Sequence, residues 1–156
     1  MIPKPQSCKE CFGWKWSQQE FVPASGSGEN GVLLLGEAAG EHEAVEGKGF
    51  VGKAGAYLFQ NLKRVGIDRE GFKISNVLSC RPKNNLLAGQ PYELEVLSKC
   101  QPFLQETCLE MQETCRKTGK HFTIVTLGKV AFKSIMGFTD KDPIMRKDYI
   151  GYPFWN

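Results

Sequence analysis

Six cysteines give this chain its clearest capacity for chemistry. Cys8 and Cys11 are separated by two residues, a spacing at which two thiolates bind one metal ion or one corner of an iron–sulphur cluster. The N-terminus has no apolar signal segment, so we expect the chain to stay in the cytoplasm, where cysteines serve metal or redox chemistry rather than disulfides. The pair alone leaves zinc, an iron–sulphur cluster and a redox-active pair open.

The other cysteines and the histidines weigh on these three interpretations. The CxxC does not lie between a strand and a helix, which disfavours a thioredoxin-like redox pair. A zinc site would need a second close cysteine pair or a pair of histidines. The chain has no second CxxC, and its only histidines, His42 and His121, are far apart in the sequence. Any further ligands would therefore be isolated cysteines. Cys108 and Cys115 are seven residues apart in a helical pattern, and we interpret them as small buried residues.

A glycine-rich loop is the second stretch suited to chemistry. The apolar run at residues 32–35 is typical of a buried strand in a parallel sheet, and the loop at residues 36–52 follows it directly. In open α/β sheets, ligands bind at the carboxyl ends of the strands, where this loop would lie. Its 17 residues are too many for a plain connection, so we predict a functional loop. It contains neither GxxxxGK[ST] nor GxGxxG, so the usual phosphate and dinucleotide motifs do not support a nucleotide site.

Alternating strands and helices position these groups. We expect strands at residues 32–35, 73–78 and 122–127, and helices at residues 54–65, 91–119 and 129–136. Pro102 is expected to kink or restart the long helix, whose buried stripe would contain Leu94, Leu97, Cys100 and Leu104. The alternation predicts one α/β domain, a three-layer α/β/α sandwich with a central, mostly parallel sheet.

Composition sets wider limits on the class of protein. A chain of 156 residues with 41% hydrophobic and 24% charged residues is ordinary for one globular domain with a real core. The net charge of +3 permits nucleic-acid binding without arguing for it. No window approaches 18 apolar residues, so we expect no contact with a membrane.

Three motifs in order resemble the iron–sulphur uracil-DNA glycosylases, family 4 of the uracil-DNA glycosylase superfamily. They are GEAAGEHEAVEGKGFVGKAG at residues 36–55, ISNVLSCRP at residues 74–82, and the cysteine set. The resemblance covers residues 8 to about 135. It implies the glycosylase fold, excision of uracil from DNA by hydrolysis of the N-glycosidic bond in base excision repair, and a structural [4Fe–4S] cluster. The cysteines that match the family's cluster ligands are Cys8, Cys11, Cys80 and Cys100.

The resemblance also implies roles for the residues of the pocket. Phe50 would stack on the uracil face. Asn76 would read the pairing edge, because its amide offers an acceptor for N3–H and a donor for O4, whereas cytosine presents the reverse pattern. Glu37 and Glu43 are the expected catalytic carboxylates, which orient the attacking water or stabilise the positive sugar; Glu43 would also crowd the methyl group of thymine. The expected uracil-binding residues are Gly36, Glu37, Ala38, Phe50 and Asn76.

The chain departs from the family pattern near its C-terminal end. Family members carry a further strand and a His-Pro motif there, and this sequence contains no His-Pro dipeptide. We therefore expect the C-terminal part of the family fold to be missing from residues 1–156 and the activity of this chain alone to be low. One alternative is a weak or inactive iron–sulphur module that binds DNA as part of a larger replication or repair protein. Another is an unrelated α/β nucleotide-binding enzyme.

Expected partners follow from the same resemblance. The substrate would be uracil-containing DNA, single- or double-stranded, with the target nucleotide flipped out of the duplex. We expect a monomer that associates with, or is fused to, replication or repair proteins.

Overall fold

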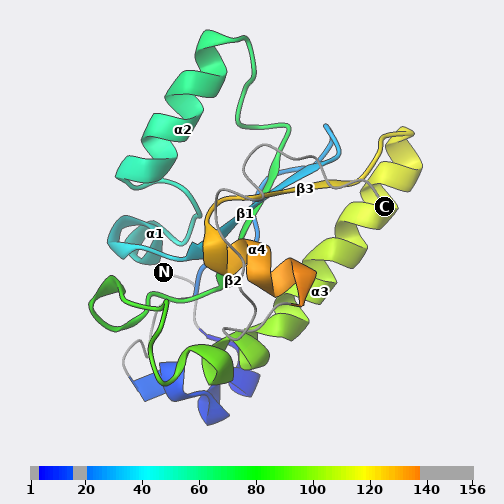
Figure 1. Ribbon diagram of the computed structural model, residues 1–156. Coiled ribbons are helices and arrows are strands. Elements are labelled where there is room, and N and C mark those ends of the chain that lie inside the picture. Colours follow the sequence, from blue (N-terminus) through cyan, green and yellow to red (C-terminus); the bar gives the residue numbers. More distant parts are fainter. Residues whose placement is uncertain (1–3, 16–20, 138–156) are drawn as a thin grey trace.

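The structure is a computed structural model that describes residues 4–15 and 21–137. In these residues three parallel strands form one sheet in the order β2-β1-β3 (Figure 1). The strands are β1 (Val32–Ala38), β2 (Lys73–Leu78) and β3 (Thr123–Thr126). The α-helices are α1 (Glu41–Glu46), α2 (Lys53–Arg64), α3 (Glu93–Thr118) and α4 (Lys129–Met136), and the short 3-10 helices are η1 (Gln6–Glu10), η2 (Phe12–Lys15) and η3 (Lys83–Asn85).

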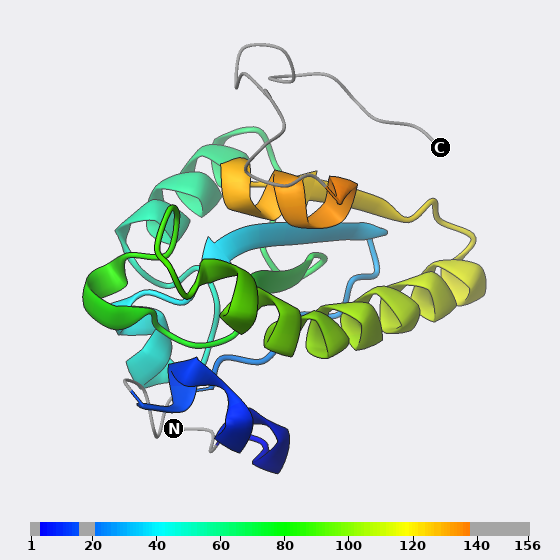
Figure 2. The ribbon, with the colours of Figure 1, turned by 60° about the horizontal axis from the view of Figure 1, so that its bottom comes forward.

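The N-terminal segment packs against the beginning of α3, as Figure 2 shows for the blue ribbon. The backbone N–H of Phe12 donates to Oε1 of Glu95 at 2.8 Å, and the Phe12 ring stacks on Tyr92 at 5.6 Å between centroids. Further along the chain, Ser25 pairs with Ile74 through two backbone hydrogen bonds of 2.9 and 2.7 Å. This pairing covers the outer edge of β2, which would otherwise expose unpaired backbone groups.

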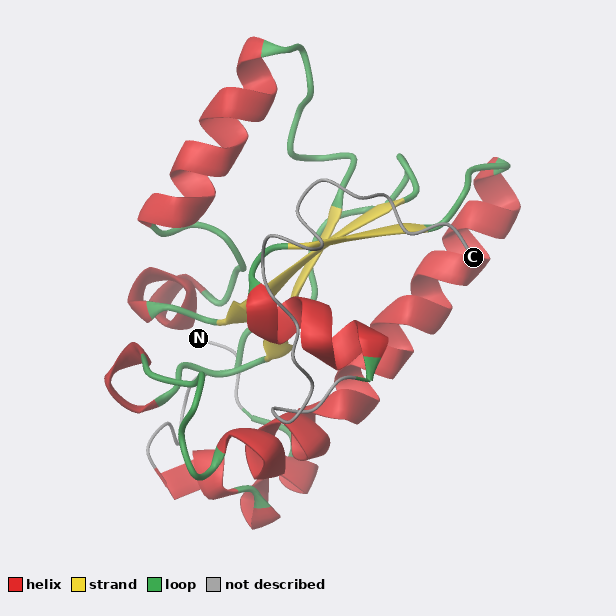
Figure 3. Ribbon diagram, viewed as in Figure 1, coloured by secondary structure: helices red, strands yellow, loops and turns green. Residues whose placement is uncertain are grey.

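Helices cover both faces of the sheet (Figure 3). Leu33 and Leu35 of β1 are fully buried on the face covered by α3 and α4, and Leu34 packs with Phe72 and Ile74 on the face covered by α2. Alternation along the strand sends neighbouring side chains to opposite faces, so an unbroken apolar run is needed where both faces are covered. The predicted α/β sandwich with a parallel sheet is confirmed.

Helix α3 runs without interruption through Pro102, which lies on its exposed side. There the missing N–H and the bulk of the ring disturb the packing least. Of the two effects expected of Pro102, a kink or a restart of the helix, the restart was therefore wrong. The predicted buried stripe was also partly wrong, because Leu94 is 69% exposed. The buried residues of α3 recur at intervals of three and four, and the apolar ones are Val96, Cys100, Leu104, Met111 and Cys115. In the part of the chain described, neither α3 nor any shorter helix has the length and apolar character to cross a membrane.

The long loop after β1 contains a short helix that the sequence pattern did not predict. Helix α1 spans six residues between Gly40 and Gly47, and it ends where Gly47 adopts a left-handed φ of 67°. Six residues are too few to establish a helical repeat in sequence, and isolated helices of this length are not stable. Its stability must come from contacts with the rest of the loop. One such contact joins the Glu43 side chain to the start of α2.

Candidate functional site

An open cleft of about 560 Å³ lies at the carboxyl ends of β1 and β2. Gly36 and Asn76 occupy paired positions on these neighbouring strands, so the strand register brings two distant motifs together. All the residues predicted to bind uracil line this cleft, and so do both predicted catalytic carboxylates. These residues are Gly36, Glu37, Ala38, Glu43, Phe50 and Asn76.

Gly36 lies between the two residues expected to hold the base. A Cβ atom at this position would collide with Oδ1 of Asn76 and stand 2.6 Å from Cζ of Phe50. The Asn76 side chain is buried, and the Phe50 ring packs beside Leu34 and Ile74. The glycine therefore allows an aromatic face and an amide to stand next to each other at the cleft.

The collision at Gly36 gives a first testable prediction. We expect Gly36→Ala to lower the free energy of unfolding by about 1–3 kcal/mol, the usual cost of inserting a methyl group into a packed region. Urea denaturation of both proteins measures this change. Gly71→Ala is the matched control, because its Cβ would come no nearer than 3.3 Å to any of the neighbouring atoms, which belong to the Asn30 side chain. Equal stabilities of the Gly36→Ala variant and the parent would contradict the geometry.

The two carboxylates of the cleft lie in different environments. Burial raises the pKa of Glu37 above its ordinary value, the negative charge of Glu93 raises it further, and a hydrogen bond from the Ala88 backbone opposes the shift. Glu43 instead accepts the backbone N–H of Gly52 at 2.8 Å, which joins α1 to the start of α2. A poorly solvated carboxylate is suited to proton transfer. The two carboxylates therefore have different roles in the cleft. Glu37 has a raised pKa, whereas Glu43 holds α1 against the start of α2.

Among the further residues that line the cleft, four with polar side chains were not expected from the sequence: Glu41, His42, Lys53 and Asn85. Asn85 is the most notable, because Asn84 and Asn85 both adopt left-handed φ values, of 55° and 58°. The Nε–H of Arg81 donates to Oδ1 of Asn85 at 2.8 Å, and Arg81 also pairs with Glu41 at 3.6 Å. Arg81 thus connects η3 to α1 at the rim of the cleft. Two successive asparagines were a usable signal, since asparagine tolerates left-handed backbone better than most residues.

The four cysteines predicted as cluster ligands converge on one region at the beginning of α3. Cys11, Cys80 and Cys100 are buried, and Cys8 is partly buried. Burial, together with the smaller contributions of the neighbouring Cys100, Cys11 and Cys8, raises the pKa of Cys80 to about 12. Burial likewise raises the pKa of Cys100 to about 11, again with contributions from Cys11 and Cys8. By contrast, burial alone accounts for the raised pKa of Cys108.

Donors and a positive charge surround these thiols. The backbone N–H of Gly13 lies 3.3 Å from Sγ of Cys11, and a hydrogen bond from the Ser79 backbone lowers the pKa of Cys100. The buried Lys4 donates to the Gly13 carbonyl at 3.0 Å, and its charge lowers the pKa of Cys80. Donors and a cation of this kind stabilise thiolates.

Over residues 4–15 and 21–137, no three His, Cys, Asp or Glu side chains form a group that could hold a single metal ion. An iron–sulphur cluster does not require such a group, because each of its cysteines binds a different iron atom, so the residues present fit a cluster.

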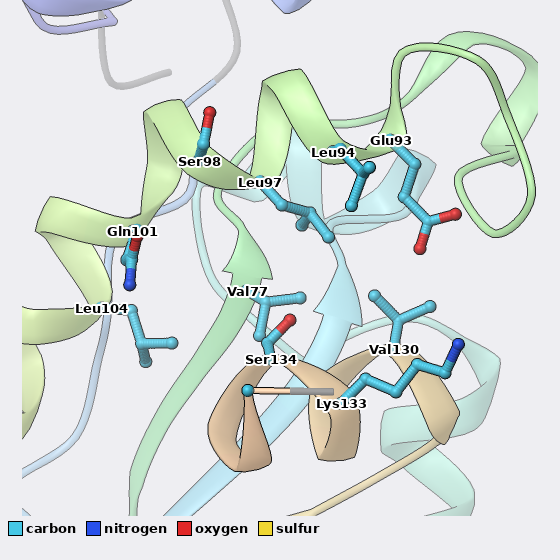
Figure 4. Close-up of a pocket in the computed structure, with 11 residues that line it drawn as sticks. Val77, Glu93, Leu94, Leu97, Ser98, Gln101, Leu104, Val130, Lys133 and Ser134 are labelled. Carbon is cyan, nitrogen blue, oxygen red and sulfur yellow. The ribbon is translucent and has the colours of Figure 1, made fainter. Parts of the chain in front are cut away.

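A second pocket, of about 250 Å³, lies between α3 and α4 (Figure 4). Much of its lining is apolar, with Val77, Leu97 and Val130 facing it, and Glu93 and Lys133 extend toward one side. Glu93 lines this second pocket, and its negative charge raises the pKa of Glu37 in the cleft. None of the predicted site residues lines this second pocket.

Comparison with known proteins decides the family. The family model described as the uracil DNA glycosylase superfamily matches residues 23–151, which is most of the chain. The chain belongs to the uracil DNA glycosylase superfamily. This confirms the resemblance drawn from the three motifs, and the superfamily's α/β fold agrees with the parallel sheet described above.

Within the uracil DNA glycosylase superfamily, the chain is similar to several proteins named type-4 uracil-DNA glycosylase. It is 33% identical to the one from Sulfurisphaera tokodaii, over 96% of this chain and 69% of the relative. The values are 35%, 82% and 58% for the Saccharolobus solfataricus protein, and 35%, 90% and 64% for the Archaeoglobus fulgidus protein. The chain thus spans between 58% and 69% of the length of these curated relatives.

Proposed function

We propose that this chain carries the uracil-binding and catalytic cleft of a uracil-DNA glycosylase, which excises uracil from DNA by hydrolysis of the N-glycosidic bond. The observation that carries the proposal is the meeting of Phe50, Asn76 and Glu37 around Gly36 at the carboxyl ends of two parallel strands. The names of the similar proteins support the same reaction.

Recognition of the base would use the face and the edge of uracil separately. The Phe50 ring stacks on the face, and the Asn76 amide donates to O4 and accepts the N3–H. Cytosine presents the opposite donor and acceptor at this edge, so it would leave the buried amide badly paired. Glu43 would stand near C5, where thymine carries its methyl group.

Hydrolysis would then proceed on a flipped or single-stranded deoxyuridine. The bond between C1′ and N1 breaks, uracil leaves with the bonding electron pair, and the sugar becomes oxocarbenium-like. Glu37 orients a water molecule toward C1′ and accepts its proton as the new C–O bond forms. The raised pKa of Glu37 supports this role, because its carboxylate lies in a partly desolvated site.

The four cysteines would hold a [4Fe–4S] cluster with a structural role. Cys8 and Cys11 come from the N-terminal segment, Cys80 follows β2, and Cys100 lies on α3. Bound there, the cluster would join these three parts of the chain, and the proposed hydrolysis needs no electron transfer from it. The DNA substrate, the monomeric state, the association with replication or repair proteins and the cytoplasmic location belong to the same proposal.

Two substitutions test how the base is recognised. We expect Asn76→Ala to weaken the binding of free uracil by about 1–3 kcal/mol, the range for a bidentate edge contact. Phe50→Ala should cost a similar amount through lost stacking. Calorimetric titration gives the Kd values, with Tyr57→Ala on the exposed side of α2 as an aromatic control. If both variants bind uracil as tightly as the parent, uracil is not held in this cleft.

Excision itself is tested on two oligonucleotides that differ at one position, deoxyuridine or thymidine. The cluster-loaded chain should release uracil from the first and no thymine from the second in single-turnover reactions. Binding of the deoxyuridine oligonucleotide without any release would favour the alternative, a glycosylase-like module that holds DNA. A cleft that binds neither the oligonucleotide nor the free base would overturn both functions.

A further inference from the structure

Phe50 presents its ring to the cleft from a backbone conformation that aromatic residues rarely adopt. Its φ is +56°, in the left-handed region. A non-glycine residue persists in such a conformation only where the surrounding structure holds it. Helix α2 supplies one constraint, because Gly55 packs directly on the Phe50 carbonyl and a Cβ at Gly55 would collide with it.

Arg69 supplies the second constraint through a forked contact. Its Nη1 donates to the carbonyl oxygen of Phe50 at 2.8 Å, and its Nη2 donates to the carbonyl oxygen of Gly49. These two oxygens belong to the peptide planes on either side of the Phe50 Cα atom. When both planes are fixed, the φ and ψ of Phe50 are fixed too, and with them the direction in which its side chain leaves the backbone.

The guanidinium group of Arg69 is itself held in place. It lies 4.4 Å from the centre of the Phe59 ring, and the side chain is partly buried. Stacking on an aromatic ring and two parallel N–H donors are contacts that the planar guanidinium makes and a lysine ammonium does not. Arg69 does not line the cleft, and both of its hydrogen bonds to the loop go to the carbonyls that flank Phe50, so its contact with the cleft residues of the loop is made through the Phe50 backbone.

We propose that Arg69 is the positioning residue of the base-stacking site: it holds both peptide planes that flank Phe50 and so directs the aromatic ring over the cleft. The inference deepens the proposed function and rests on it for the identity of the base. The geometric part concerns Arg69 and Phe50 alone. Arg69→Lys keeps the positive charge and removes the fork, so it is the variant that isolates the proposed contact.

The first measurement follows the Phe50 backbone by NMR, using chain labelled at phenylalanine. The Cα and Cβ shifts of Phe50 should report left-handed backbone in the parent chain and move toward the values of ordinary extended or helical backbone in Arg69→Lys. Arg64→Lys is the control, since Arg64 is an exposed arginine of α2 whose Nη1 donates to Oδ1 of Asn61 at 3.3 Å. It should leave the Phe50 shifts unchanged. Unchanged Phe50 shifts in Arg69→Lys would overturn the proposal whether or not the chain binds uracil.

The second measurement is a double-mutant cycle on the Kd for free uracil. Arg69→Lys should weaken binding about 3–10-fold in the parent chain and have no further effect when Phe50 is already alanine, because a positioning residue acts through the group it positions. A merely structural loss would weaken both backgrounds equally, and that additive result would overturn the proposal. A parent chain that does not bind uracil would refute the proposed function, while the Phe50 shifts would still decide the role of Arg69.

Discussion

Glu37→Gln should lower the single-turnover rate of uracil release by about 10²–10³-fold, the range expected when one positioned acid–base or charge-stabilising group is removed. Glutamine has nearly the shape of glutamate, so the hydrogen bond from the Ala88 backbone can persist while the proton acceptor is lost. The binding of free uracil should change far less than the rate, because Glu37 is assigned to the reacting sugar and water. Glu46→Gln, an exposed carboxylate on α1 outside the cleft lining, is the control.

The same residue gives the reaction an expected pH dependence. The ionised carboxylate is the form that accepts a proton, so the rate should rise with pH as Glu37 deprotonates. Burial and the charge of Glu93 raise the pKa of Glu37, so the midpoint should lie above 4.5, the ordinary value for a glutamate. In Glu37→Gln this step should vanish from the pH–rate profile. A profile that keeps the same midpoint in the variant would assign the titration to another group and leave Glu37 without its role.

Cys80→Ser should remove the cluster, which is the second large effect. The parent chain, purified without oxygen, should contain about four irons and four sulphides, and the variant should lose most of both. Loss of metal should also lower the thermal midpoint, because a cluster that joins the N-terminal segment to β2 and α3 contributes its binding free energy to folding. Iron and sulphide analysis with thermal unfolding measures both consequences.

Cys108→Ser is the matched control for the cluster. Cys108 is a partly buried cysteine of α3, and the neighbouring thiols make no contribution to its pKa. Its substitution should leave the iron content unchanged. If Cys80→Ser keeps the iron content of the parent chain, Cys80 is not a cluster ligand. If Cys108→Ser loses iron, Cys108 is a ligand, contrary to the prediction.

Much of the fold follows from local patterns that sequence alone displays. The strand at residues 73–78 and the helix at residues 129–136 have the predicted bounds, and a glycine cap marks the end of the helix clearly. Helix α1 was missed because six residues between glycines carry no repeat. In α3, leucines at Leu94 and Leu109 resemble core residues, yet the geometry of packing against β2 turns them toward solvent.

The sequence motifs predicted which residues form the candidate site, but not how these residues are arranged in space. The two motifs placed Phe50 and Asn76 in one pocket, but their contact across Gly36 depends on the register of β1 against β2. Arg69 lies in a polar connection where nothing in the sequence distinguishes it from the other arginines of the chain. Its two hydrogen bonds to the carbonyls of Gly49 and Phe50 form only once the fold brings the connection after α2 next to the loop after β1.

The function of the cleft is tested most directly by locating free uracil on the labelled chain by NMR titration. We predict that uracil shifts the side-chain amide signals of Asn76 and the backbone signals of Gly36 and Phe50, and that thymine at the same concentration shifts them much less. Shifts confined to the second pocket, at residues such as Leu97 and Val130, or equal responses to uracil and thymine would contradict the claim that the cleft at the ends of β1 and β2 recognises uracil.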